Sequence, residues 1–108
     1  DWKYDPAKFS YIPRDASAAA IVSSALFELS GFLGSKGKAY KEFAIASLQS
    51  LSSAEYLAKP GTNGHFLLKH SVGSIPHGVE VDVPIVYADY YYLEAILRYQ
   101  RTTKNFNK

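Results

Sequence analysis

One long apolar stretch constrains the fold of this chain more than any other feature. Between residues 16 and 33 the only charged side chain is Glu28. Apolar residues recur at helical spacing along this stretch, namely Ala18, Ile21, Val22, Ala25, Leu29 and Phe32, and Ala19, Leu26 and Leu33 widen the apolar surface. A helix that is apolar on nearly all sides needs neighbours on more than one side. The stretch therefore predicts a core helix within a larger chain or an oligomer.

The start and the end of this helix are both marked in the sequence. Asp15 or Ser17 offers a side-chain oxygen to the first free N–H groups of a helix, and the glycine-containing residues 34–37 break it. We expect a second helix over residues 38–58, with Tyr40, Phe43, Ala44, Leu48, Leu51 and Tyr56 as its apolar face. Because the break is short, the two helices are predicted to form an antiparallel hairpin.

A long connection and a third helix are expected in the second half of the chain. Residues 65–72 are predicted to form a short strand or an extended segment, and residues 73–84 an irregular loop with several Pro and Gly. Asp89 is expected to cap a helix over residues 90–102, with an apolar seam of Leu93, Ile96 and Leu97 and an i,i+4 ion pair of Glu94 with Arg98. The predicted fold class is therefore all-α, with about three helices and one long loop in a single unit, residues 1–108.

The charge balance and the amino-acid content narrow the possible partners. The chain has twelve basic and ten acidic residues, which gives a net charge of +2. It lacks the stripe of basic residues that nucleic-acid binding needs. No apolar run approaches the roughly 20 residues of a membrane span. We therefore expect neither a nucleic acid nor a membrane as a partner. Absence of cysteine removes thiolate metal sites but leaves the compartment open between cytoplasm and periplasm.

Three stretches of the sequence carry a resemblance to a known family. They are residues 12–20 (IPRDASAAA), residues 67–73 (LLKHSVG) and residues 80–95 (EVDVPIVYADYYYLEA). In this order and at this spacing they resemble the C-terminal region of glycoside hydrolase family 88, the unsaturated glucuronyl hydrolases. The resemblance covers nearly the whole chain, and it is weaker to the unsaturated rhamnogalacturonyl hydrolases of family 105.

The resemblance implies a fold and an activity. The fold would be an (α/α)6 toroid of six helical hairpins around a central cleft, with this chain as its C-terminal hairpins. The substrate would be an oligosaccharide made by a lyase, with an unsaturated uronic acid at its non-reducing end. In the family an Asp protonates the vinyl ether double bond, water adds, and the hemiketal opens to release the sugar. The family's essential aspartates lie upstream of the matched region, so we assign no catalytic residue here and expect this fragment to be inactive alone.

A candidate binding loop follows from the second stretch. Some family members bind a sulfated second sugar through a Ser-x-x-Ser-x-Lys loop, and Ser71 and Ser74 match its two serines. Pro76 stands where the motif has Lys, and Pro cannot supply a charge for sulfate. An unsulfated or differently sulfated substrate is therefore an equal expectation. His70 resembles an aromatic position that lines the subsite of the first sugar, although a His in a loop also commonly bonds a backbone carbonyl.

Two further residues complete the predicted set of substrate-binding residues, which is Trp2, Arg14, His70, Ser71 and Ser74. Trp2 could stack on a sugar ring or pack on a helix end, and Arg14 could bind a carboxylate or pair with a nearby acid. The spacing of the three histidines matches no zinc pattern, so we expect neither a metal nor a cofactor.

A second hypothesis requires no catalysis. A helical interaction module that dimerises through its apolar first helix would explain the composition nearly as well. The sequence leaves open the second sugar, the linkage and the oligomeric state.

Overall fold

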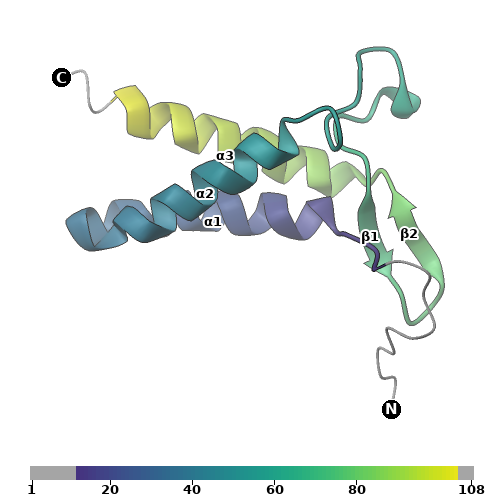
Figure 1. Cartoon of the computed structure of the whole chain (residues 1–108), viewed down its shortest axis with the longest axis horizontal. Helices are drawn as coiled ribbons and strands as arrows, with labels where there is room; N and C mark the ends of the chain where they lie inside the picture. The colour runs from purple at the N-terminus through teal and green to yellow at the C-terminus, as the bar shows by residue number, and fades with distance from the viewer. Residues whose placement is uncertain (1–11, 105–108) are drawn as a thin grey trace.

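The structure is a computed structural model and describes residues 12–104 of the chain. Three helices, α1 (Ala16–Leu33), α2 (Lys38–Leu51) and α3 (Val86–Lys104), are accompanied by strands β1 (Ser71–Ser74) and β2 (Val79–Val83). Helix α1 packs against both α2 and α3, and the β-hairpin lies at the end of the helices where α1 and α3 begin (Figure 1). The described part is thus mostly helical, and the two-stranded sheet corrects the all-α prediction.

The beginning and the end of α1 agree with the sequence. Asp15 has extended backbone and its Oδ1 atom accepts hydrogen bonds from the backbone N–H of Ser17, at 3.0 Å, and from the Ser17 hydroxyl, at 2.6 Å. This is the geometry of an N-cap. A 3₁₀ turn, Gly34–Gly37, then reverses the chain into α2, which runs antiparallel to α1 (Figure 1). The predicted helical hairpin is confirmed.

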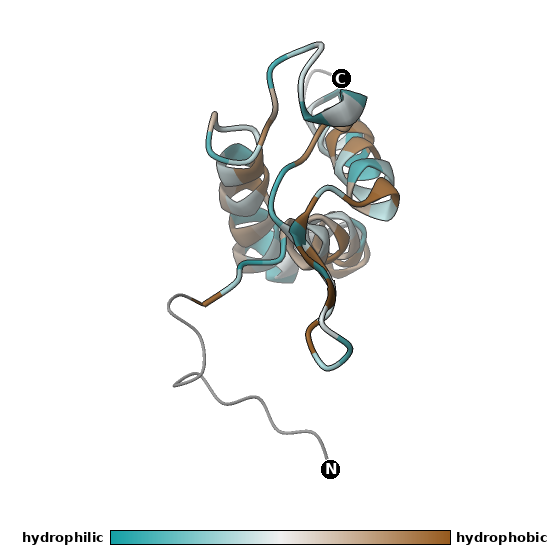
Figure 2. Cartoon of the chain, turned by 90° about the vertical axis from the view of Figure 1, so that its right-hand side faces the viewer, coloured by the Kyte–Doolittle hydropathy of each residue, from teal (hydrophilic) through white to brown (hydrophobic). Residues whose placement is uncertain are grey.

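The buried face of α1 is made of small and hydroxyl-bearing residues. They are Ala16, Ser17, Ala20, Ser23, Ser24 and Ser30, with Phe27 as the one large side chain. The apolar stripe of Ile21, Val22, Leu29, Phe32 and Leu33 is exposed, and Phe32 is 81% accessible. Figure 2 looks along the helices and shows hydrophobic residues recurring on each of them. Small side chains let α2 and α3 approach α1 closely, and the larger apolar ones are left facing outward.

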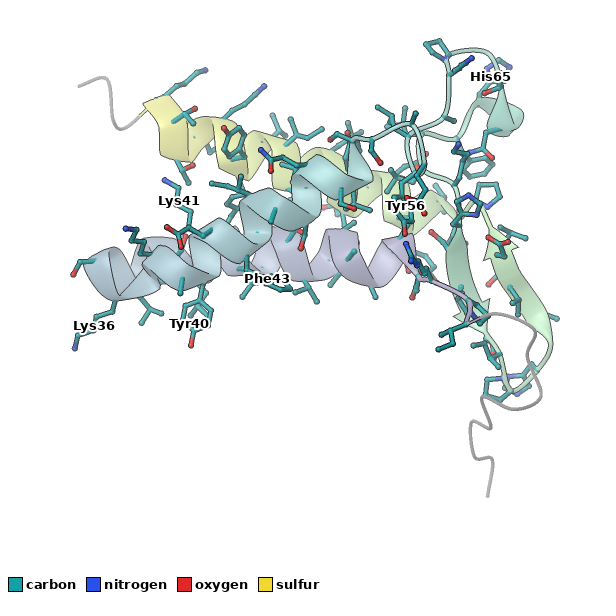
Figure 3. The ribbon with its side chains drawn as sticks, in the orientation of Figure 1. Lys36, Tyr40, Lys41, Phe43, Tyr56 and His65 are labelled. Atoms are coloured by element: carbon teal, nitrogen blue, oxygen red, sulfur yellow. The ribbon has the colours of Figure 1, made fainter. Side chains whose placement is uncertain are left out.

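The second helix ends earlier than predicted, at Leu51. The reason is local, because the hydroxyls of Ser52 and Ser53 bond to the carbonyls of Leu48 and Ser50, at 2.8 and 2.7 Å. Serine side chains that capture backbone carbonyls compete with helix continuation. Of the predicted face, four members are buried (Ala44, Leu48, Leu51 and Tyr56), whereas Tyr40 and Phe43 are exposed and project from α2 away from α3 (Figure 3).

The third helix begins four residues before the predicted start, at Val86. The cap prediction for Asp89 is wrong, because Asp89 lies inside the first turn and its carboxylate accepts the backbone N–H groups of Leu67 and Leu68, at 2.8 and 3.0 Å. The predicted seam is also largely wrong. Leu93 and Leu97 are exposed, and the buried residues of α3 are Ala88, Tyr92 and Ala95.

A set of polar contacts around Arg98 and Glu94 joins α3 to α1. The predicted ion pair of Glu94 with Arg98 is confirmed at 3.5 Å. Arg98 also donates to the Ser24 carbonyl at 2.9 Å, and the Ser24 hydroxyl donates to the Glu94 carboxylate at 2.5 Å. These groups link the two helices through polar atoms where small side chains leave little apolar area.

The long connection contains the sheet that the sequence did not predict. Strands β1 and β2 pair antiparallel with Ser71 opposite Val83, Val72 opposite Val81, and Ser74 opposite Val79. Asp82 has no counterpart between the first two pairs, so it is the extra residue of a β-bulge. Pro76 and Gly78, which indicated a loop, lie in the turn between the strands, where the Gly78 N–H donates to the Ile75 carbonyl at 3.0 Å, whereas Pro84 follows β2.

The apolar content of the first two helices bears on the membrane prediction, which was wrong about the length of the apolar stretch. Within the described residues, the helical stretch Ala16–Leu51 holds an 18-residue window that is long and apolar enough to cross a membrane by length and composition. The core helix of a larger helical protein passes the same test.

Candidate functional site

An open pocket next to the hairpin is lined by several charged and polar side chains. It has a volume of about 630 Å³ and lies where the start of α1, the turn after α2 and the β-hairpin meet. Its lining residues are Ile12, Arg14, Glu55, Tyr56, His70 and Asp82. Tyr56 marks this junction in Figure 3. Of the predicted binding residues, Arg14 and His70 are brought together here.

Arg14 is held against the turn that follows α2. Its Nη1 atom donates to the Tyr56 hydroxyl at 2.9 Å and to Glu55 Oε1 at 3.2 Å. The hydrogen bond to Tyr56, followed by the electrostatic attraction of Tyr56 and Glu55, raises the pKa of Arg14 above its ordinary value. The guanidinium therefore stays cationic at any pH used in an assay. Since the pair with Glu55 is exposed, it adds little to stability, and its effect is to orient the cation at the pocket.

His70 is fixed through both its backbone and its side chain. Its carbonyl accepts the backbone N–H of Ala16, one of the free donors at the start of α1, at 3.0 Å. Its Nδ1 atom lies 2.5 Å from Asp82 Oδ1. The ring also meets Tyr56 edge-on, with ring centroids 6.1 Å apart and an interplanar angle of 89°. An imidazole held at these points has one defined orientation in the pocket.

The two residues of the His70–Asp82 contact have unusual backbone conformations. His70 and Asp82 have φ angles of 63° and 57°, in the left-handed region. For residues other than glycine this region costs about 1 kcal/mol each, even for Asp and His, which tolerate it best. The side chains of His70 and Asp82 are 43% and 34% exposed, and a pair this exposed returns about 0–1 kcal/mol. The contact does not offset the backbone cost, so the surrounding structure holds both residues in place.

The two serines of the predicted loop lie outside the pocket lining. Ser71 is completely buried, and its Oγ has no hydrogen-bond partner among the described residues. Ser74 Oγ lies 2.6 Å from His77 Nδ1, across the hairpin turn. Trp2 falls outside the described residues. Binding by Ser71, Ser74 and Trp2 therefore stays a prediction.

The three histidines are spread over separate parts of the structure. His65 is on the outer loop that follows α2 (Figure 3), His70 is in the pocket and His77 is in the hairpin turn. Within residues 12–104 no group of three or more His, Cys, Asp or Glu side chains could hold a metal ion.

The predicted binding residues omitted four of the six residues that line the pocket, Ile12, Glu55, Tyr56 and Asp82. Glu55 and Tyr56 were assigned to the second helix, and only its early end turns them toward Arg14. Asp82 lay in a predicted loop, although residues 79–83 (VEVDV) alternate between apolar and polar side chains, which is the period of a strand. The left-handed backbone at Asp82 has no sequence signal, because Asp is tolerated but not required there.

The known proteins that are similar to this chain belong to one class of enzyme. No family model matches the chain. Its similar proteins of known structure and its curated relative are all glycoside hydrolases, with sequence identities well above the level at which a likeness indicates the fold alone.

Each of these relatives is an unsaturated glucuronyl hydrolase. The enzyme from Formosa agariphila is 50% identical over 99 residues, which cover 92% of this chain and 24% of the relative. A crystal structure of an unsaturated glucuronyl hydrolase specific for heparin matches with 55% identity and a TM-score of 0.83, over 85% of this chain and 24% of the other. The enzyme from Streptococcus agalactiae matches with 34% identity and a TM-score of 0.75, over 83% and 24%. The resemblance to glycoside hydrolase family 88 is confirmed: the chain spans about a quarter of the length of these enzymes, consistent with a C-terminal portion.

Proposed function

We propose that the whole protein is an unsaturated glucuronyl hydrolase, and that this chain forms C-terminal helical hairpins of its (α/α)6 toroid. The observation that carries the proposal is the 55% identity and TM-score of 0.83 to an enzyme of this activity over most of the chain. The outward apolar stripes of α1 and α3 support the toroid, because neighbouring hairpins would cover them. The rest of the parent chain is therefore the proposed partner of these faces.

The reaction proposed for the whole protein is removal of an unsaturated uronic acid by hydration of its double bond. The proton donor is assigned to the part of the protein outside this chain. Asp15 and Asp89 suit structural roles better, since both accept backbone N–H groups.

Unsaturated disaccharides derived from heparin are the proposed substrate. The support is the higher identity to the enzyme specific for heparin, 55%, than to the Streptococcus agalactiae enzyme, 34%. Pro76 in place of a Lys is consistent with a substrate other than the one that the Ser-x-x-Ser-x-Lys loop binds, either unsulfated or differently sulfated. Arg14 and His70 are proposed to line the sugar subsite in the pocket. Ser71 and Ser74, on the neighbouring strand β1, are proposed to take part in binding the second sugar.

A panel of unsaturated disaccharides tests both the proposed activity and the proposed substrate. The full-length protein is incubated with disaccharides from heparin, chondroitin sulfate and hyaluronan, and ultraviolet absorbance of the double bond is followed. A saturated disaccharide serves as the blank. We expect the fastest loss with a heparin disaccharide. No loss with any member would refute the activity, whereas preference for a chondroitin disaccharide would refute only the substrate assignment.

The alternative function, a dimerisation module, is favoured by one observation. Several large apolar residues of α1 and α3 are exposed, including Phe32 and Val86, at 81% and 70%. Sedimentation of the full-length protein separates the two proposals, because a toroid that covers these faces internally stays monomeric. A dimer that dissociates when Phe32 is replaced by Asp, without catalytic activity, would favour the module.

A further inference from the structure

We propose that Asp82 is a positioning residue for His70, which it holds in one tautomer so that Nε2 faces the pocket as a hydrogen-bond acceptor for a sugar hydroxyl. This rests on the proposed function, in which His70 lines the sugar subsite. Asp82 itself is not assigned a contact with the substrate.

The chemistry of the pair fixes the proton. An ionised carboxylate only accepts hydrogen bonds, so the imidazole nitrogen facing it carries the hydrogen. The nitrogen that faces Asp82 Oδ1 is Nδ1. The neutral ring then has its lone pair on Nε2, which has no hydrogen-bond partner among the described residues. A sugar hydroxyl is the complementary group, because it can donate to Nε2 and accept from a neighbouring cation such as Arg14.

The backbone is arranged to bring the two side chains together. Asp82 is the extra residue of the bulge between the pairs Ser71–Val83 and Val72–Val81. Bulges re-aim side chains, and they recur beside functional sites. A left-handed residue in a bulge is most often glycine, yet this position carries the carboxylate that meets His70. The contact of this carboxylate with Nδ1 of His70 supports orientation of the ring as its role.

The other acidic and hydroxyl groups of the pocket do not duplicate Asp82. Glu55 and the Tyr56 hydroxyl both accept from Arg14. Tyr56 meets the imidazole only with its ring. Of the lining residues that the structure describes, Asp82 alone makes a hydrogen bond to the ring of His70.

The test is the full-length enzyme with Asp82→Gly, a variant that removes the carboxylate and suits the left-handed backbone. Glu80→Gly is the matched control, because Glu80 lies on the same strand with a φ angle of 53° and does not line the pocket. Loss of a charge-assisted hydrogen bond that orients a ligand-binding group changes affinity roughly tenfold. We therefore expect KM for the unsaturated disaccharide to rise about tenfold in Asp82→Gly, with kcat within about twofold and no change in Glu80→Gly. Should Asp82→Gly fold poorly, Asp82→Asn is the second variant, because Asn tolerates the left-handed backbone and removes the negative charge.

A double-mutant cycle shows whether Asp82 acts through His70. In a His70→Ala background, removal of Asp82 is expected to leave KM unchanged, because the ring to be oriented is gone. A full additional rise in KM would overturn the inference, and so would a normal KM in Asp82→Gly while His70→Ala is impaired. If His70→Ala itself has a normal KM, the proposed role of His70 fails and the inference fails with it. An enzyme without activity on any unsaturated disaccharide would instead refute the proposed function, and with it this role for Asp82.

Discussion

Replacement of Asp89 by Ala tests how the loop that positions His70 is attached to the helices. The Asp89 carboxylate accepts the N–H groups of Leu67 and Leu68, at 2.8 and 3.0 Å. Leu68 is completely buried and Leu67 is partly buried. Without the carboxylate, neither N–H has a partner on the helix.

The expected cost follows from these two donors. A buried donor left without a partner costs about 1–3 kcal/mol, which gives about 2 kcal/mol for Leu68 and, with some access to water, about 1 kcal/mol for Leu67. Alanine raises helix propensity by roughly 0.5 kcal/mol, and loss of an acidic side chain from the first turn lowers stability by a similar amount. The net destabilisation is therefore about 3 kcal/mol. Asp89→Asn keeps one acceptor, so we expect about half of this loss.

Urea unfolding of the full-length protein measures the free energy, and hydrogen exchange of the Leu67 and Leu68 amides measures the local effect. Both amides should lose protection in Asp89→Ala. Glu42→Ala is the control, because Glu42 makes only an exposed i,i+4 pair with Lys38, at 3.8 Å, and should change stability by less than about 0.5 kcal/mol. Asp89→Ala with wild-type stability and unchanged exchange at both amides would refute the reasoning.

Four further substitutions test the packing of the helices and the hairpin. Gly37→Ala should lower stability by about 1–3 kcal/mol, because its Cβ would lie 2.6 Å from the Ser30 carbonyl oxygen. Gly31→Ala should raise stability by about 0.5–1 kcal/mol, because its Cβ meets nothing within 4 Å. Urea unfolding that ranks the two variants in the opposite order would contradict this packing. Ser71→Ala removes a buried hydroxyl without a partner, so unfolding should show equal or higher stability, by up to about 1 kcal/mol; a clear loss of stability would mean that the hydroxyl is bonded. Phe32→Asp should lower the melting temperature of the full-length protein although Phe32 is 81% exposed here, and an unchanged melting temperature would show that no neighbouring hairpin covers it.

Local signals in the sequence predicted the helices better than their faces. The cap at Asp15 and the glycine break after Leu33 act within one or two turns, and both were found. The faces could not be predicted from apolarity, because α1 buries four serines, two alanines and Phe27 and leaves most of its larger apolar residues exposed. That choice is set by how closely α2 and α3 approach, which is a tertiary property. The resemblance identified the family, and the contact of Asp82 with His70 required coordinates.

The pattern of contacts explains why three separate stretches of sequence carry the family resemblance together. The first contains Asp15, which accepts from Val72 N at 3.1 Å in addition to capping α1. The third contains Asp89, which accepts from Leu67 and Leu68 of the second. Both aspartates lie in or just before the first turn of a helix, where the dipole favours a negative charge. Each also accepts backbone hydrogen bonds from the same segment, residues 67–73. The segment that presents His70 is thus attached to the beginnings of two helices, so a change in any one stretch would move the pocket. A loop fixed in this way can hold left-handed residues that a free loop would relax.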